Sequence, residues 1–301
     1  MTYLFLMTWP MMAIGWVTTL FQRGLTSLDR IGAVLADTPV LHDPAKPLPL
    51  PLKSGTISIR NLTFGYDGQD STPVLAGVNL EIKPGFTGIV GKTGSGKTTL
   101  CQLLARIYPV EDSQLIWNSI DYNRLALSAL RSQIAYVPQD TLLFSETIAA
   151  NIGFGKPTAN QEEIERAAQM AAIHDEIINF KEGYQSKIGE KGVLLSGGQR
   201  QRVALARALL MDRPMMIIDD GLSAVDTDTE YRIIRAFDQW LPGRTCIMVS
   251  HRVAPIIEAD EIVVMDEGKI VAQGNHHMLL ADNRFYRTIF NHQMSAGEGD
   301  S

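Results

Sequence analysis

Residues 91–98 read Gly-Lys-Thr-Gly-Ser-Gly-Lys-Thr, and this octapeptide decides the fold. It follows the apolar run Thr87–Val90, which predicts a buried strand, and it precedes the helical stretch Thr99–Ile107. A glycine-rich loop between a strand and a helix is the pattern of a phosphate-binding loop. The glycines let backbone N–H groups turn inward around phosphate oxygens, and the start of the helix adds partial positive charge.

The side chains of this loop have separate predicted roles. Lys97 is expected to reach the β- and γ-phosphates of a nucleotide, and Thr98 is expected to be a ligand of Mg²⁺. The other residues that we expect to contact the nucleotide are Gly91, Thr93, Gly94, Ser95, Gly96 and Thr99.

An acidic pair follows a second apolar run and supplies the other part of such a site. Met215–Ile218 reads as a buried strand and leads directly into Asp219 and Asp220. Asp219 is the expected magnesium-binding acid. A solvated turn is the plainer interpretation of two acids, and the phosphate-binding loop argues against it. Loop and acid together indicate a P-loop NTPase, a class with many functions.

The hydrophobic pattern around these motifs predicts an α/β fold. Thr56–Phe64 and Val74–Ile82 alternate apolar and polar residues, as an antiparallel sheet with one buried face does. Short apolar runs separated by helical stretches predict a parallel sheet covered on both faces. These runs are Thr87–Val90, Ile134–Val137, Met215–Ile218, Cys246–Ser250 and Glu261–Met265. Gln161–Ile178 reads as a mainly helical insert.

A third motif narrows the class. Leu195-Ser196-Gly197-Gly198-Gln199, followed by Arg-Gln-Arg, resembles the signature sequence of ABC-type ATPases. Ser196, Gly197 and Gly198 stand where a helix begins, so hydroxyl and N–H groups face an anion. The resemblance implies that ATP is the nucleotide, and that Ser196–Gln199 contact the γ-phosphate bound to an opposite subunit. It also implies a mostly parallel, RecA-like core with an antiparallel β subdomain and a helical subdomain that carries the signature.

Further residues match the family's landmarks in order. Tyr66 matches the aromatic residue that stacks on adenine, and Gln139 matches the glutamine that senses Mg²⁺ and the attacking water. Ser223–Asp226 resembles the loop that reaches across the dimer, and His251 resembles the switch histidine near the γ-phosphate. Taken singly, a tyrosine or a histidine is more often a packing residue. Together these matches extend the resemblance over residues 54–290, the expected nucleotide-binding domain.

The N-terminal segment differs from the rest of the chain. No charged side chain occurs between Tyr3 and Gln22, and about 20 apolar residues are enough to span a bilayer. We expect a transmembrane helix at 1–22, with a buried or interfacial helix as the alternative. A single span cannot enclose a transport path. The chain would then begin inside the last helix of a longer membrane domain, or pair with separate membrane subunits.

Two connecting segments complete the expected organisation. Residues 23–53 are expected to continue the helix into water and to end in a proline-rich, semi-rigid linker, with prolines at 39, 44, 47, 49 and 51. Residues 291–301 end in Gly-Glu-Gly-Asp-Ser and are expected to form a flexible tail.

Composition limits the partners and the compartment. The net charge of −6 provides no basic stripe, which argues against nucleic acid as a partner. The two cysteines, Cys101 and Cys246, lie in separate apolar stretches and indicate buried thiols in a reducing compartment. We therefore expect an inner-membrane protein whose ATPase domain lies in the cytoplasm.

Two features favour exporters over importers within the family. The first is the apolar span fused ahead of the ATPase domain, because importer ATPases are generally separate chains. The second is Ile188–Gly192, which resembles an exporter-specific loop, although Glu190 alone reads as a solvated acid. The resemblance implies ATP-driven export of a small molecule or lipid. A soluble ABC ATPase that serves separate subunits or a non-transport task, and a nucleotide-binding regulatory module, are the alternatives.

One position departs from the family pattern. Most active members carry Glu after the metal-binding acid, where it polarises the attacking water, and this chain has Asp220. The shorter side chain withdraws the carboxylate by about 1.5 Å, and a misplacement of roughly 1 Å can cost about a hundredfold in rate. We therefore expect Asp220, Gln139 and His251 to form a weak catalytic site, in a subunit paired with an unlike partner. A homodimer that uses Asp220 as its base is the alternative.

Overall fold

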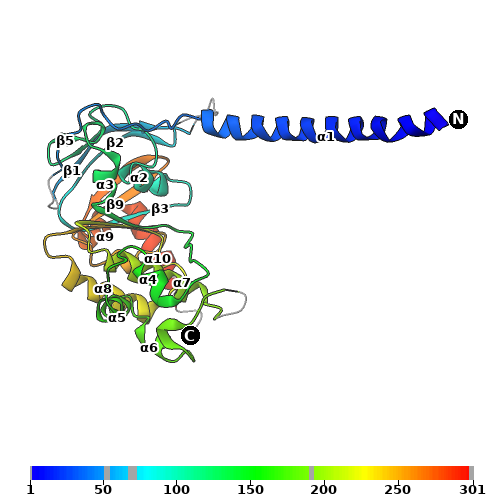
Figure 1. Ribbon diagram of the computed structural model, residues 1–301. Helices are drawn as coiled ribbons and strands as arrows, with labels where there is room; N and C mark the ends of the chain where they lie inside the picture. Colours follow the sequence, from blue (N-terminus) through cyan, green and yellow to red (C-terminus); the bar gives the residue numbers. More distant parts are fainter. Residues whose placement is uncertain (1, 51–54, 67–72, 190–192, 298–301) are drawn as a thin grey trace. The chain divides into compact units, whose positions relative to one another are not determined.

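The computed structural model describes residues 2–50, 55–66, 73–189 and 193–297, and Figure 1 shows how their elements are arranged. The chain divides into two compact units, Met1–His42 and Asp43–Ser301. The expected domain start at Ser54, and Glu190 with the two residues after it, lie outside the described residues.

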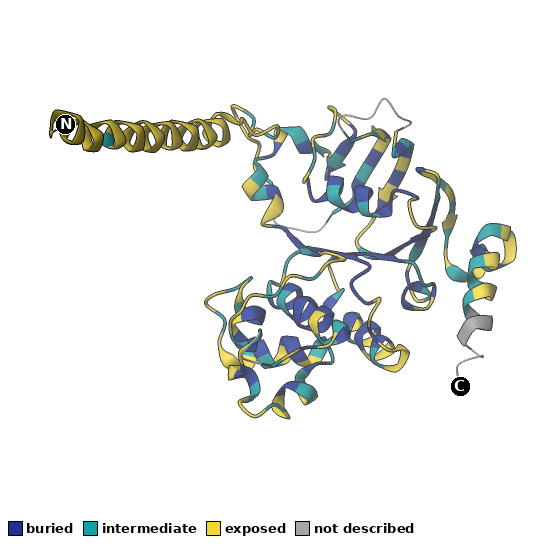
Figure 2. Cartoon of the chain, turned by 90° about the vertical axis from the view of Figure 1, so that its right-hand side faces the viewer, coloured by how far each residue is buried: buried dark blue, intermediate teal, exposed yellow. Residues whose placement is uncertain are grey.

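The first unit contains one long helix, α1 (Thr2–Ala36), with no buried residue (Figure 2). Its 35 residues extend for about 50 Å, which exceeds the roughly 30 Å of a bilayer's hydrocarbon core. Length and composition alone would let α1 cross a membrane. The hydroxyls of Thr18 and Thr19 donate to the carbonyls four residues earlier, at 2.7 and 2.8 Å, which pairs them within the helix. Helix α1 continues through residue 22, as expected.

The proline-rich stretch is bound to the second unit from Asp43 onward. Asp43 accepts a hydrogen bond from the backbone N–H of Leu127 at 2.7 Å, and Leu48 donates to the carbonyl of Arg124 at 2.8 Å. The expected tether is therefore attached to the domain along part of its length.

The second unit opens with an antiparallel sheet of order β2-β1-β4-β5, as the alternating pattern predicts. Ile57 pairs with Ile82 on one side and with Trp117 on the other, and all three side chains are buried. The strands are β1 (Ile57–Phe64), β2 (Leu75–Ile82), β4 (Leu115–Trp117) and β5 (Ile120–Asp121).

A six-stranded sheet of order β10-β9-β3-β8-β7-β6 forms the centre of the unit, and only β10 runs antiparallel to its neighbour. All five apolar runs expected to be parallel strands lie in it. Since parallel strands end at one edge, the segments after β3, β6, β7 and β8 meet there. The strands are β3 (Gly85–Gly91), β6 (Ile134–Val137), β7 (Met215–Asp219), β8 (Thr245–Ser250), β9 (Glu261–Asp266) and β10 (Lys269–Gly274).

Helices lie against the sheets, and α4, α5 and α7 pack together (Figure 1). The α-helices of the second unit are α2 (Lys97–Leu104), α3 (Leu127–Arg131), α4 (Ile148–Gly153), α5 (Gln161–Met170), α6 (His174–Ile178), α7 (Gly197–Leu210), α8 (Thr227–Trp240), α9 (His276–Asp282) and α10 (Arg284–Gly297). Short 3₁₀ turns occur at Tyr122–Arg124, Gly183–Gln185 and Ala254–Ile256.

Three helix boundaries differ from the sequence expectation. The helix after the loop begins at Lys97 and ends at Leu104, because Arg106 takes a left-handed φ of 50° that an α-helix cannot continue through. The helical insert divides into α5 and α6, where Ala172 takes a φ of 51°. Helix α10 covers residues 291–297 of the expected flexible tail, and the rest of that tail lies outside the described residues.

Both cysteines are buried and free, as expected. Cys101 lies in α2 and Cys246 in β8, and burial raises the pKa of both thiols. They are packing residues of the core.

Candidate nucleotide-binding site

The loop between β3 and α2 has the conformation that its glycines allow. Gly94 and Gly96 take left-handed φ angles of 81° and 93°. A Cβ on Gly96 would lie 2.6 Å from the Leu75 side chain, and one on Gly91 would lie 2.1 Å from the Met265 carbonyl oxygen. Larger residues at these two positions would force the loop away from the sheet.

The N-terminus of α2 has no side-chain cap. Its N-cap residue is Gly96, which carries no side chain to accept the first backbone N–H groups. These orphan donors of the first turn are therefore not occupied by a capping side chain, and they can bind an anion.

The buried Lys97 side chain binds the backbone of the phosphate-binding loop. Its ammonium donates to the carbonyl oxygens of Gly91 and Lys92, both at 2.8 Å, and only 4% of the residue is exposed. Burial lowers the pKa of Lys97, while Asp220 and Asp219 oppose that effect. The amine thus binds the backbone of the phosphate-binding loop itself.

Thr98 and Asp219 meet across the edge of the sheet, although 121 positions separate them in the sequence. The Thr98 hydroxyl donates to Asp219 Oδ1 at 3.0 Å, and the Tyr136 hydroxyl donates to Oδ2 at 3.2 Å. Burial raises the pKa of Asp219, and the two hydroxyl donors counteract this. The sequence analysis did not identify Tyr136, because a tyrosine within a strand carries no signal for this contact.

The donor set at this edge fits Mg²⁺. The ion is typically bound in proteins by one or two carboxylates and completes its shell with waters and phosphate oxygens. Asp219 supplies a buried carboxylate and Thr98 a hydroxyl within 3.0 Å of it. Among the residues that the structure describes, no group of three His, Cys, Asp or Glu side chains could hold a metal by itself. A magnesium ion at Asp219 would therefore depend on nucleotide oxygens.

Asp220 lies beside the switch histidine in an unusual backbone conformation. Its φ is 52°, a left-handed value that Asp adopts more readily than most residues do. Its Oδ1 accepts a long hydrogen bond of 3.4 Å from the backbone N–H of His251, and 8% of the residue is exposed. The ends of β7 and β8 thus place the expected base and the switch histidine side by side.

Gln139 reaches the same edge from β6. Val137 pairs with Ile218, so Gln139 follows β6 at the level where Asp220 follows β7. Gln139 is exposed. The parallel pairing thus places the loop, Asp219, Asp220, His251 and Gln139 at or directly after strand ends on one edge of the sheet.

Tyr66 contacts the first turn of α2. Its hydroxyl shares a hydrogen bond with Thr99 Oγ1 at 3.0 Å and donates to Gln102 Oε1 at 3.2 Å. Its ring packs edge-on against Tyr108, with centroids 5.2 Å apart. An aromatic ring therefore lies next to α2, the helix that follows the phosphate-binding loop.

The signature segment, unlike the phosphate-binding loop, has a side-chain cap at the start of its helix. The Ser196 hydroxyl accepts from the Gln199 N–H at 3.2 Å, and Gln199 Oε1 accepts from the Ser196 N–H at 2.8 Å, which forms a capping box for α7. A Cβ on Gly198 would lie 2.6 Å from the Ala224 carbonyl oxygen. Within the described residues, no hydrogen bond or ion pair joins residues 195–199 to the phosphate-binding loop.

The segment Ser223–Asp226 is tied to α7 by Gln201, a residue that the sequence analysis did not identify. The Gln201 side chain donates to Ser223 Oγ at 3.0 Å and accepts from the Ala224 N–H at 2.9 Å. Asp226 caps α8 by accepting from the Thr229 N–H at 2.9 Å, a bond that lowers the pKa of Asp226. The structure thus shows a capping role for Asp226.

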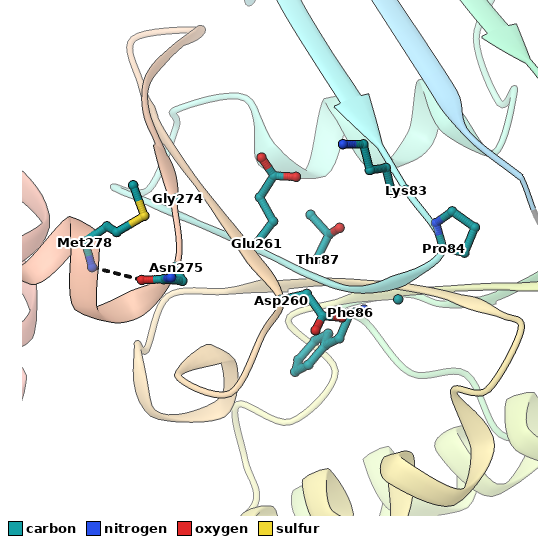
Figure 3. A pocket seen from close by; sticks show the side chains of 10 residues that line it. Lys83, Pro84, Phe86, Thr87, Asp260, Glu261, Gly274, Asn275 and Met278 are labelled. Atoms are coloured by element: carbon teal, nitrogen blue, oxygen red, sulfur yellow. Dashed lines mark hydrogen bonds between the residues drawn. The ribbon is translucent and has the colours of Figure 1, made fainter.

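A separate hollow of about 410 Å³ lies at the opposite edge of the large sheet (Figure 3). It is lined at the amino ends of β3 and β9 by residues that include Thr87, Asp260 and Glu261, and near α9 by Met278. Residues 88–90 of β3 lie between the hollow and the phosphate-binding loop, a separation of roughly 13 Å. It is distinct from the candidate nucleotide site.

Comparisons with known proteins identify the family that this chain resembles. The model of the ABC transporter family matches residues 75–223. The multidrug resistance-like ATP-binding protein MdlA of Escherichia coli K12 is 42% identical over 294 residues, which are 97% of this chain and 49% of that protein. An ATP-dependent lipid A-core flippase of Salmonella paratyphi A is 40% identical over 291 residues, which are 96% of this chain and 49% of the flippase.

A solved structure agrees as well, and confirms the expected fold class. The structure of a bacterial Atm1-family ABC exporter with ATP bound matches with a TM-score of 0.85 and 32% identity, over 93% of this chain and 49% of that chain. The chain spans about half the length of the relatives that it matches. It therefore belongs to the ABC transporter family and has the fold of an ABC nucleotide-binding domain.

Proposed function

We propose that this chain is the ATP-binding and ATP-hydrolysing part of an ABC exporter subunit. The observation that carries the proposal is the contact of Thr98 with Asp219 beside the uncapped start of α2. A phosphate-binding loop, a magnesium acid and a hydroxyl ligand are the parts that phosphoryl transfer requires.

Each residue of the edge then has a role. The N–H groups of residues 91–98 and the Lys97 ammonium bind the phosphates, and Tyr66 stacks on the adenine. Thr98, Asp219 and Gln139 hold the Mg²⁺, which neutralises charge on the phosphate oxygens when bound. Asp220 and His251 orient the attacking water and stabilise the transferring phosphoryl group.

The signature segment supports a dimer. Ser196 can still donate its hydroxyl proton while its oxygen accepts in the capping box. In this proposal, Ser196–Gln199 contact the γ-phosphate held by a second ABC subunit. Asp226 is the last residue of the loop Ser223–Asp226, which reaches toward that subunit. ATP binding would draw the two domains together.

The second subunit is proposed to be unlike this one. Asp220 is one methylene shorter than the usual Glu, and its carboxylate already accepts the His251 N–H at 3.4 Å. Both features hold the carboxylate back from a water that a longer side chain would reach. This chain would then contribute one weak site of its own and the signature half of the partner's strong site.

Helix α1 supports a membrane location, because its length and composition are sufficient for a span. We propose that it belongs to the membrane domain of the exporter, with the second unit in the cytoplasm and the span in the inner membrane. The relatives are named for multidrug resistance and for a lipid A-core flippase. A hydrophobic small molecule or a lipid is therefore the proposed cargo.

The proposal is tested with the complex purified through a tag on this chain, in lipid nanodiscs. We expect Lys97→Ala to weaken Mg²⁺-ATP binding by this chain at least about a hundredfold, because a buried charge-assisted contact to phosphate is lost. Lys83→Ala, outside the site, serves as the control. Unchanged binding in the Lys97 variant would refute a nucleotide site here, and recovery of the chain without membranes would favour a soluble ABC ATPase.

A further inference from the structure

The backbone of the switch histidine is held by two side chains from distant parts of the chain. Asp220 accepts its N–H, and the side-chain amide of Gln293 donates to its carbonyl oxygen at 2.7 Å. The same Gln293 accepts the N–H of Val253 through Oε1 at 2.8 Å. Gln293 thus bridges two backbone groups of residues 251–253, directly after β8 ends.

The position of Gln293 is set by the packing of α10. Tyr286 is fully buried, and its hydroxyl lies 2.8 Å from Nδ1 of His276. The Phe290 ring lies 5.2 Å from the His276 ring. Tyr286, Phe290 and Gln293 recur at spacings of four and three, so they lie on one face of the helix. The face that anchors α10 therefore presents Gln293 to the switch segment.

The segment is also held through the Arg252 guanidinium, which donates to the Leu222 carbonyl oxygen at 3.0 Å and pairs with Glu230, but these are contacts of a side chain and not of the backbone of His251. After β8 its N–H groups no longer pair with a neighbouring strand, and Arg252 N–H donates to the side chain of Ser250 at 2.9 Å. Val253 is 1% exposed, so its N–H would be left without a partner if Gln293 were removed. Asp220 and Gln293 hold the peptide groups on the two sides of His251.

We propose that Gln293 is a positioning residue for His251, so that the C-terminal helix sets the geometry of the switch histidine. This inference rests on the proposed function, since the role of His251 is part of it. Gln293 touches neither nucleotide nor metal in this account. It acts by fixing the backbone from which the imidazole extends, and catalytic groups must be held within about 0.5 Å of their working geometry.

Hydrogen–deuterium exchange on the nucleotide-free complex tests the contact itself. Gln293→Met keeps the length of the side chain and removes its donor and its acceptor. We expect the Val253 amide to exchange at least about tenfold faster in this variant. Thr288→Ala is the matched control, because its hydroxyl bonds to the Arg284 carbonyl within α10. Equal exchange in Gln293→Met and the wild type would overturn the proposal.

The ATP turnover rate distinguishes a Gln293 that positions His251 from one that only anchors α10. We expect Gln293→Met to lower kcat about fivefold or more in an Asp220→Glu, Ser196→Ala background, in which the partner's strong site no longer dominates turnover, with ATP affinity changed less than twofold. Gln293→Glu retains an acceptor for Val253 but presents a carboxylate to the His251 carbonyl. We therefore expect it to restore protection of the Val253 amide without restoring kcat. Wild-type kcat in either variant would overturn the proposal.

A failure of the proposed function is recognised separately. If Lys97→Ala removed no ATPase activity from the complex, the proposal that this chain hydrolyses ATP would be wrong. The exchange measurement would still test the contact of Gln293 with the backbone of residues 251–253. If Lys97→Ala removed the activity and both Gln293 variants turned over normally, only the positioning role would be wrong.

Discussion

The two glycine-rich helix starts of this molecule, at α2 and at α7, are surrounded very differently. At α2 the N-cap is Gly96, without a capping side chain, while the Thr98 hydroxyl donates to Asp219 at the end of β7. At α7 a capping box formed by Ser196 and Gln199 already occupies N–H groups of the segment. In the proposed function, the start of α2 binds phosphate through its backbone N–H groups, and the start of α7 binds phosphate through the hydroxyl proton of Ser196.

The difference indicates which half of a site each start supplies. The proposed metal ligands and the candidate base lie near α2, and among the described residues none of them is in hydrogen-bond contact with the signature segment. A site that needs both helix starts must then draw one of them from another copy or another subunit. Substitutions near the two helix starts test this difference.

Asp219→Asn should have the largest effect at the α2 end. It replaces the buried carboxylate that accepts from Thr98 and Tyr136 by an amide. We expect Mg²⁺-dependent ATP retention by this chain to fall at least about a hundredfold. The measurement is binding of a fluorescent ATP analogue with and without Mg²⁺. Retained Mg²⁺ dependence would remove Asp219 from the metal site.

Asp220→Glu should raise hydrolysis at this chain's own site. The added methylene moves the carboxylate about 1.5 Å outward, and we expect a gain of about tenfold to a hundredfold in single-turnover rate. ATP affinity should change little, because the side chain acts on the water. A rate equal to or below that of the wild type would contradict a site weakened by its short acid.

Tyr136→Phe should have a smaller effect, because it removes one of two hydroxyl donors to Asp219. We expect about tenfold weaker Mg²⁺ binding to the ATP complex, since partners of a metal ligand orient it. Tyr231→Phe, which alters an exposed tyrosine on α8, is the control. The comparison is made by titrating Mg²⁺ into each variant at fixed ATP.

Asp226→Ala should act on stability. Loss of the cap on α8 should lower the free energy of unfolding by about 1 kcal/mol, measured by urea denaturation. The pKa of Asp226 is lowered in the folded state from its ordinary 3.8. The cap's contribution is therefore present above about pH 3.8 and is lost as the pH falls below it. Asp228→Ala, in the first turn of the same helix, should show a smaller loss.

The sequence predicted the framework of this molecule well, because its signals are local. Apolar runs such as Ile134–Val137 and Met215–Ile218 became parallel strands, and parallel pairing brings their ends together. The meeting of Thr98 with Asp219 follows from that topology. The division of the helical insert at Ala172 did not follow, because a single left-handed residue leaves no pattern in composition.

Contacts between side chains and remote backbone were not predictable. Gln293 binds His251 across 42 positions, and Gln201 binds Ser223 across 22. In the sequence, each is a glutamine within a helix, and only the fold determines which groups it contacts. The capping role of Asp226 was not predictable for another reason, because an Asp at this place fits both a family landmark and the N-cap of a helix.

The most direct test of the account compares Ser196→Ala with Asp220→Asn in the complex purified through this chain. Steady-state ATPase activity is the measurement. The account predicts that Ser196→Ala lowers total turnover at least about tenfold more than Asp220→Asn does, because Ser196 completes the partner's strong site. An equal or larger loss from Asp220→Asn would contradict it, and would indicate a homodimer in which Asp220 is the working base.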